Sequence, residues 1–128
     1  MRQIPLGLAL IALPSAAAAA APIEGRWQNP KDSVIVNVAP CGAGTWCGKV
    51  SWACPKAKRK TNSSLVGSSL LTGLKADGKG GYRGRVYLPK RRMHAIATVR
   101  PIGADSLLIK GCVLAGVLCR AERWTRVR

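Results

Sequence analysis

Acidic side chains and histidine are scarce in this sequence of 128 residues. Five Asp and Glu and a single histidine stand against 21 Lys and Arg, giving a formal net charge of +16. A catalytic or metal site needs several nucleophilic, acid–base or ligating groups together. Phosphate-binding loops, Gly-x-Ser-x-Gly and metal-ligand spacings are also absent. We therefore expect a non-enzymatic protein with no catalytic residue, metal or cofactor.

The few titratable groups have ordinary structural interpretations. The three aspartates lie at predicted turns, where Asp hydrogen-bonds the backbone. Glu122 lies between Arg120 and Arg123 and is predicted to form a surface ion pair. His94 follows two arginines at the start of a predicted strand and is expected to be exposed or satisfied. Should the alternative of an enzyme hold, His94, Glu122 and Cys54 are its candidates.

The sequence has no apolar run of the roughly 20 residues that a membrane span needs. Its apolar run at residues 4–13 follows a charged start and precedes an alanine-rich segment at residues 15–21. That order is typical of a bacterial secretory signal peptide. We expect a signal peptide over residues 1–20, cut among Ala18 to Ala20. Residues 21–128 would then form one domain in the periplasm or outside the cell.

Sustained helical periodicity is missing as well, and the runs between turn residues look like strands. Residues 65–74 fit either a helical turn or a strand, and residues 55–62 are expected to be a basic loop. Seven or eight short antiparallel strands predict a small sandwich or a closed barrel. We favour the barrel, because closure removes the sheet edges. The clearest predicted strands are residues 33–39, 46–53, 82–88, 93–99, 107–113 and 117–127.

The predicted strand at residues 46–53 alternates between two faces. Trp46, Val50 and Trp52 share one face, which we expect to point into the barrel. Stacking on nucleic-acid bases needs exposed aromatic side chains. Tryptophans placed in the core therefore argue against a specific nucleic-acid site.

Five cysteines lack the spacing of zinc or C-x-x-C redox sites. In an oxidising compartment, structural disulfides are expected instead. Local pairing favours Cys41–Cys47 across a glycine-rich turn and Cys112–Cys119 across another hairpin. A long-range pairing between the two hairpins remains an alternative. Cys54 is left over, as a free thiol or as an intermolecular link.

Two dense basic segments, at residues 56–60 and 90–92, attract phosphates, anionic lipid head groups, acidic polysaccharide or nucleic acid. Much of that attraction is non-specific and is screened by salt. A plain solvated basic surface is the alternative. The candidate residues for binding an anionic surface are Lys56, Lys58, Arg59, Lys60, Lys90, Arg91 and Arg92.

Gly25-Arg26-Trp27 lies near the start of the expected domain, and Trp124-Thr125-Arg126 lies near its end. Together these two motifs resemble lipocalins and their calycin relatives. Gly25-Arg26-Trp27 is similar to the G-x-W of their first strand, and Trp124-Thr125-Arg126 supplies a terminal arginine. The resemblance implies that the Arg126 guanidinium lies on the Trp27 indole and closes the barrel, a structural cation–π pair.

Six sequence blocks span nearly the whole expected domain in order: GRW at 25–27, APCG at 39–42, WCGKV at 46–50, LLTGL at 70–74, GCVLAGVLC at 111–119 and WTR at 124–126. On these blocks the chain also resembles the exported bacterial family called domain of unknown function 2147. The resemblance implies a lipocalin-like barrel and supplies no catalytic residue. The segment 88–94 departs from the Asn-Pro-x-x-Gly turn usual in the family, and the loop after Cys54 is short and basic.

Together these observations predict a disulfide-stapled, calycin-like barrel that binds a small or amphipathic ligand, or an anionic component of the cell envelope. The interior of so small a barrel is either a cavity or filled by side chains, and in the second case only surface binding remains. The alternatives are a basic protein that binds nucleic acid or acidic polysaccharide, and an enzyme of unknown type. Oligomeric state does not follow from the sequence.

Overall fold

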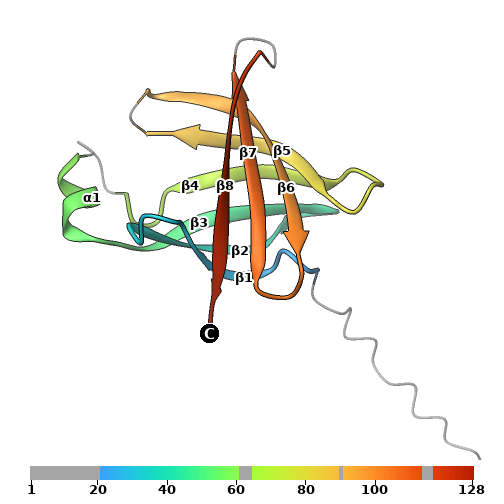
Figure 1. Ribbon diagram of the computed structural model, residues 1–128, viewed down its shortest axis with the longest axis horizontal. Helices are drawn as coiled ribbons and strands as arrows, with labels where there is room; N and C mark the ends of the chain where they lie inside the picture. Colours follow the sequence, from blue (N-terminus) through green and yellow to red (C-terminus); the bar gives the residue numbers. More distant parts are fainter. Residues whose placement is uncertain (1–20, 61–64, 90, 114–116) are drawn as a thin grey trace, which may run out of the picture.

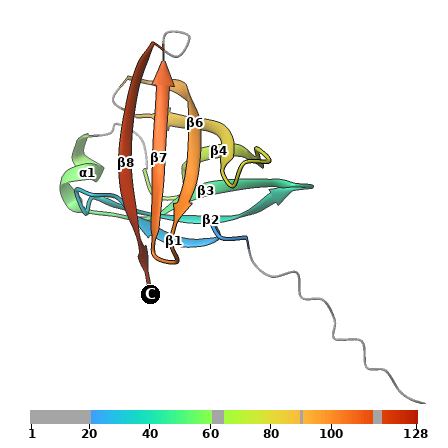
Figure 2. The same ribbon diagram turned by 45° about the vertical axis from the view of Figure 1, so that its right-hand side comes forward.

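Eight antiparallel strands, each paired with its neighbour in sequence, close into a barrel through pairing of the last strand with the first (Figures 1 and 2). The computed structural model describes residues 21–60, 65–89, 91–113 and 117–128, so the expected signal peptide lies outside the described residues. The prediction of an all-β antiparallel barrel is confirmed. The strands are β1 Gly25–Gln28, β2 Val34–Gly42, β3 Thr45–Ala53, β4 Ser69–Ala76, β5 Tyr82–Leu88, β6 Met93–Ile102, β7 Ser106–Val113 and β8 Leu118–Val127.

Alternating exposure along the strands follows from the two-residue period of β-structure. In β6, Ala95, Ala97 and Val99 are buried while the residues between them are exposed. The ambiguous segment 65–74 forms strand β4 over its second half. Buried apolar side chains fill the barrel, and each contributes about 1.5–3 kcal/mol of transfer free energy. Among the most deeply buried are Ile23, Trp27, Val36, Val50, Leu71, Leu74, Val99 and Leu107.

The basic segment after β3 is not a loop, as the sequence predicted, but a short helix, α1, over Pro55–Lys60. Proline suits the first helical position, and Ala, Lys and Arg favour helix. Cys54 occupies the N-cap position: its carbonyl accepts the Lys58 N–H at 3.0 Å, and its sulfur accepts the Ala57 N–H at 3.4 Å. The thiol left over in the sequence therefore caps α1. Within the described residues, no helix has the length and apolar character to cross a membrane.

Trp52 does not point into the barrel, which corrects the prediction from alternation. A register shift pairs Ile35 with Trp52 but Val36 with Val50, so Ser51 is an extra residue in β3. This β-bulge shifts the alternation by one position. Val50 stays buried, whereas Trp52 is 43% exposed. Trp46 is partly buried and packs against the core.

The up-and-down topology gives the barrel two distinct ends. The strand ends that connect β1 to β2, β3 to β4, β5 to β6 and β7 to β8 lie at one end, toward the left and top of Figure 1, together with α1. We call this the basic end. The other three hairpins, the start of β1 and the end of β8 lie at the opposite end, which we call the terminal end.

Candidate functional site

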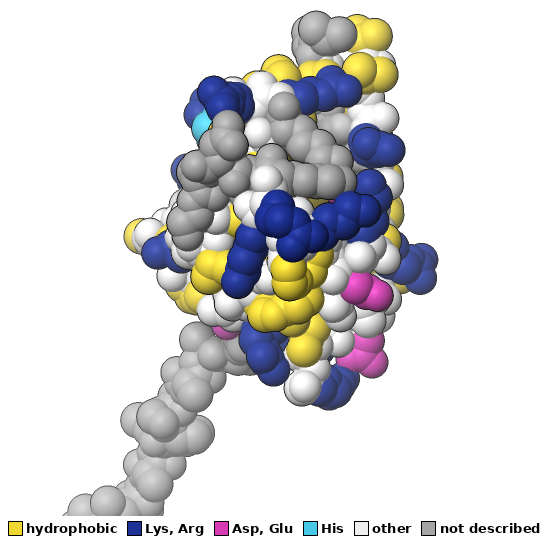
Figure 3. Space-filling model, turned by 90° about the vertical axis from the view of Figure 1, so that its left-hand side faces the viewer, with side chains coloured by type: hydrophobic (Ala, Val, Ile, Leu, Met, Phe, Trp, Pro, Cys, Tyr) yellow, Lys and Arg dark blue, Asp and Glu magenta, His cyan; other side chains and the backbone are white. Residues whose placement is uncertain are grey.

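The barrel brings the two basic segments of the sequence to the same end. α1 presents Lys56 and Arg59, and the connection between β5 and β6 presents Arg91 and Arg92, all exposed. Figure 3 views the α1 side and shows Lys and Arg side chains spread over it. Of the other predicted anion-binding residues, Lys58 is exposed on α1. Lys90 and the Lys60 side chain lie outside the described residues.

Exposed apolar side chains gather at the same basic end. In the described part of the chain, six large hydrophobic residues are exposed and four of them lie there, and apolar atoms lie among the basic ones in Figure 3. Exposed apolar surface beside cations is typical of sites that meet amphipathic partners. The four are Val66 (40% exposed), Met93 (39%), Val117 (84%) and Leu118 (52%).

Strand β8 adds two charged side chains on its inner face. Glu122 lies opposite Ile109, and Arg120 lies opposite Gly111, whose other neighbour is the fully buried Ala97. Residues directly opposite in an antiparallel pair share a face. Arg120 is exposed although it lies on the inward face, so its side chain reaches solvent near the end of the barrel.

The predicted surface ion pair of Glu122 is wrong. Its Oε1 accepts a hydrogen bond from the indole N–H of Trp124 at 3.1 Å. Among the described residues, neither Arg120 nor Arg123 forms an ion pair with it; Arg128 and Asp105 form the ion pair seen there. The two-residue period places Glu122 on the face of Trp124 and Arg123 on the opposite face. Arg120 shares the face of Glu122, but its side chain is exposed.

Below the basic end the interior is filled where glycines face large side chains. A Cβ at Gly48 would lie 2.7 Å from a methyl group of Val36, and one at Gly84 would lie 2.9 Å from a methyl group of Leu74. Such contacts leave no room for a ligand at these levels. The described interior is therefore filled by side chains at the levels of Gly48 and Gly84.

Arg92 has a backbone conformation that is uncommon for a side-chain-bearing residue, with φ of 51°. The left-handed region is strained for residues other than glycine. The hairpin thus keeps a cation at a position where glycine is the easier residue.

Acidic groups lie mostly away from the basic end. Glu24, Asp77 and Asp105 are at the terminal end, while Asp32 lies in the turn between β1 and β2. Backbone N–H groups of Lys79 and Gly81 lower the pKa of Asp77 below its usual 3.8. The charge asymmetry gives the basic end a positive potential that draws anions.

The candidate groups for catalysis do not form one site. His94 lies opposite Tyr87 on the outer face of the sheet, with the two rings 5.1 Å apart, whereas Glu122 faces inward. Cys54 caps α1. No group of three or more His, Cys, Asp or Glu side chains suited to a metal ion occurs in the described part of the chain.

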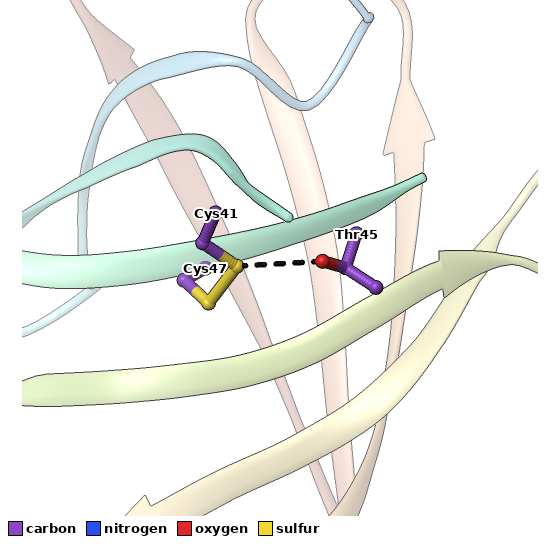
Figure 4. The surroundings of a disulfide bond; sticks show 3 residues. All are labelled: Cys41, Thr45 and Cys47. Atoms are coloured by element: carbon purple, nitrogen blue, oxygen red, sulfur yellow. Dashed lines mark hydrogen bonds between the residues drawn. A yellow bond between two sulfur atoms is a disulfide. The ribbon is translucent and has the colours of Figure 1, made fainter. Parts of the chain in front are cut away.

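The cysteines pair locally. Cys41 and Cys47 join the two strands of the β2–β3 hairpin at the terminal end, where a Cys41 sulfur lies 3.7 Å from the Thr45 hydroxyl (Figure 4). Cys112 and Cys119 join directly opposite positions of β7 and β8 near the basic end. The long-range alternative is not the arrangement formed. The second disulfide fastens the strand ends that carry Leu118.

Trp27 and Arg126 meet at the terminal end. The guanidinium carbon of Arg126 lies 4.3 Å from the centroid of the Trp27 ring. Trp27 is buried, and its indole N–H donates to the Ile23 carbonyl at 2.9 Å. The contact joins β1 and β8, the two strands whose pairing closes the barrel, at the end opposite the basic end.

Neither Arg120 nor the exposed apolar residues of the basic end were predicted from the sequence. The sequence signal for Arg120 was the two-residue alternation of a strand. Arg120 and Trp124 lie four residues apart in one strand and therefore share a face. The apolar residues gave no such signal, because an isolated Val, Met or Leu near a turn is commonplace.

Comparison with known proteins agrees with the barrel. A family model described as "Uncharacterized protein conserved in bacteria (DUF2147)" matches residues 25–126. A solved structure of protein HP1028 from Helicobacter pylori, described as belonging to the lipocalin family, superposes with a TM-score of 0.62 at 15% sequence identity. The match covers 82% of each chain and shows a shared fold. No curated protein sequence matches this chain.

Proposed function

The chain belongs to the DUF2147 family of bacterial proteins, and from that premise we propose that it binds an anionic amphipathic molecule of the cell envelope at the basic end of its barrel, without turnover. The observation that supports this most directly is the shared location of exposed apolar and cationic side chains. Met93 and Leu118 would contact the apolar part, and Arg91 and Arg92 the acidic group. The lipocalin-like fold fits the binding of small ligands.

The proposed location is the periplasm or the exterior of the cell. The two disulfides support it, because such bonds persist in oxidising compartments. There the anionic amphipaths are lipids, so the acidic group is a phosphate and the apolar part an acyl chain. The filled interior favours contact with the end of such a molecule over engulfing it.

The test is flotation of the protein with vesicles of phosphatidylglycerol and, for comparison, of phosphatidylcholine. We expect binding to the anionic vesicles alone, falling steeply as salt rises. Binding of dodecyl phosphate below its critical micelle concentration, compared with that of uncharged dodecanol, shows whether the protein binds a single amphipathic molecule. Binding to single molecules indicates a ligand site, and binding to vesicles alone indicates a membrane-surface site.

Matched pairs of variants distinguish binding at the basic end from non-specific attraction to the positive charge of the whole protein. Arg91→Gln with Arg92→Gln should weaken vesicle binding by about tenfold or more, at roughly 1 kcal/mol per cation. Arg83→Gln with Arg85→Gln, on the same strand pair but along the outer face of β5, removes equal charge and should have a small effect. Equal losses in the two pairs would refute the proposed location.

The apolar contribution has its own control. Leu118 is 52% exposed at the basic end, and Ile96 is 45% exposed in the middle of β6. Leu118→Ser should weaken binding by about tenfold, the value of one buried leucine, while Ile96→Ser should leave it unchanged. Binding that is insensitive to Leu118→Ser would show that charge alone acts.

A further inference from the structure

A second surface with recognition chemistry lies on the outer face of β1, β2 and β3. Strand pairing aligns two outward rows of side chains across β8, β1, β2 and β3. Amide, hydroxyl and cationic groups dominate these rows, and neither contains an acid. The first row consists of Thr125, Gln28, Ile35 and Trp52, and the row beside it consists of Val127, Arg26, Asn37 and Lys49.

The β-bulge in β3 creates a groove beside these rows. Because Ser51 is the extra residue, Trp52 points outward and is 43% exposed. The groove is shallow and open to solvent, has a volume of about 420 Å³, and is lined by Arg26, Gln28, Ile35, Ser51 and Trp52. The Ser51 hydroxyl donates to the Ile35 carbonyl at 3.2 Å, which holds the bulge in place.

The polar side chains of the groove are available to a ligand. In the described part of the chain, the Arg26 guanidinium and the Gln28 amide make no hydrogen bond or ion pair with protein groups. Asn37 and Lys49, in the neighbouring row, are exposed. An exposed indole flanked by unpaired donors combines an apolar wall with directional polar groups, as binding sites do.

We propose that this groove binds an acidic polysaccharide, a chain of sugars that carry carboxylates. The C–H face of a pyranose ring is weakly positive and packs on the negative face of the Trp52 indole. Gln28 and Ser51 are placed to hydrogen-bond ring hydroxyls, and Arg26 matches a carboxylate with two parallel N–H donors. The proposal does not depend on the lipid site, because it uses another face of the barrel.

A nucleic acid fits the groove less well. Its backbone carries one phosphate per nucleotide, so its binding sites follow the strand with a track of cations. Only Arg26 among the groove-lining residues is cationic. One amide, one hydroxyl and one guanidinium around a single aromatic ring suit a sugar acid.

The test uses the full chain and an oligomer of galacturonic acid, with its methyl ester as the matched neutral probe. Binding is measured by calorimetry and by the change in tryptophan fluorescence. We expect the acid oligomer to bind at least about tenfold more tightly than the ester, since one carboxylate–guanidinium pair is lost. Equal binding of both would overturn the role given to Arg26.

Three variants locate the site, and a fourth controls for charge. Trp52→Ala and Gln28→Ala should weaken binding of the acid oligomer by about tenfold and several-fold respectively. Arg26→Gln should remove the preference for the acid over the ester, whereas Arg83→Gln, on the outer face of β5, should preserve it. Trp52 is partly exposed, so thermal unfolding should confirm that Trp52→Ala remains folded.

The remaining outcomes all bear on the proposal. Equal effects of Arg26→Gln and Arg83→Gln would overturn it in favour of non-specific charge. Tighter binding of oligothymidylate through Trp52 and Arg26 would assign the groove to nucleic acid instead. Loss of lipid binding in the Arg91 and Arg92 variants, with sugar binding retained, would show that the two sites are independent.

Discussion

The guanidinium of Arg126 lies over the indole of Trp27 and also donates hydrogen bonds to three backbone carbonyls. Its Nη1 donates to Glu24 at 2.9 Å, its Nη2 to Pro22 at 3.1 Å and its Nε to Ala104 at 2.8 Å. One side chain at the end of β8 thereby fastens the segment before β1 and the turn between β6 and β7. Charge-assisted bonds of this kind contribute about 1.5–3 kcal/mol each.

The glycine of the G-x-W motif makes room for this contact. A Cβ at Gly25 would lie 2.5 Å from the Arg126 Nη1, and Gly25 has a φ of 126°. Gly25→Ala should destabilise the protein by about 2 kcal/mol or more, through strain and displacement of Arg126. Gly44→Ala is the control, because Gly44 has a φ of 70° but an open surrounding. Denaturant unfolding that gives equal losses would contradict the steric role of Gly25.

Arg92 is expected to lower the stability of the fold and to contribute to the binding of anionic vesicles. Its φ of 51° is strained for arginine and easy for glycine. Arg92→Gly should therefore raise the free energy of unfolding by about 0.5–1 kcal/mol. The same variant should weaken binding to anionic vesicles, since it removes a cation from the basic end. Arg91→Gly lacks the conformational gain and should only destabilise; a stabilising effect there would argue against the reasoning.

Cys54 is expected to act as a helix cap and not as a catalytic or linking thiol. Serine is a strong N-cap residue whereas alanine is a poor one. Cys54→Ser should match or exceed the wild-type stability, and Cys54→Ala should lose about 0.5–1 kcal/mol, as measured by thermal unfolding. A dimer under oxidising conditions that disappears in Cys54→Ser would instead identify an intermolecular disulfide.

The disulfide between Cys112 and Cys119 should stabilise the β7–β8 hairpin. Closing so short a loop contributes about 2 kcal/mol by the chain-entropy estimate. Replacing both cysteines by serine should lower the melting temperature by roughly 8–16 °C for a domain of this size. The variant should also bind vesicles less well, because Leu118 loses its anchorage. The Cys54→Ser variant controls for loss of a cysteine as such.

Asp77 gives the stability a pH dependence at acid pH. Hydrogen bonds from Lys79 and Gly81 hold the pKa of its carboxyl below 3.8 in the fold. A group with a depressed folded pKa stabilises above its unfolded pKa, and that contribution is lost as the pH falls through the folded pKa. Asp77→Asn should thus be less stable than wild type at neutral pH.

The difference from Asp77→Asn should shrink toward about pH 2, where the wild-type carboxyl is protonated too. Thermal unfolding over that range measures it. Asp32→Asn is the control, because the Asp32 side chain accepts no hydrogen bond among the described residues. A gap between Asp77→Asn and wild type that is constant with pH would contradict the assignment.

Local chemistry made much of the fold predictable. Two-residue alternation marked β6, and the residues of β5 coincide with the predicted strand at 82–88. Turn glycines separated the strands, and the spacing of the cysteines favoured the local pairs that form. These features depend on neighbours in the chain, so the sequence alone shows them.

The incorrect predictions arose from effects that the two-residue alternation of side chains along a strand does not reveal. A single bulge residue, Ser51, moved Trp52 from the expected core to the surface. Glu122 turned inward to the Trp124 indole rather than pairing with Arg123. A proline at the first helical position and a capping thiol made α1 a helix where the basic composition indicated a loop.

The sequence by itself determined a stapled antiparallel barrel with a large positive charge, because strand period, turn residues and charge are properties of short segments. Only the tertiary structure decided where that charge acts. Barrel closure brings strand ends that are distant in the chain to one end of the barrel. As a result, α1, Arg92, Met93 and Leu118 all lie at the basic end. Long-range strand register, set by packing of the whole core and not by any local pattern, is the physical reason.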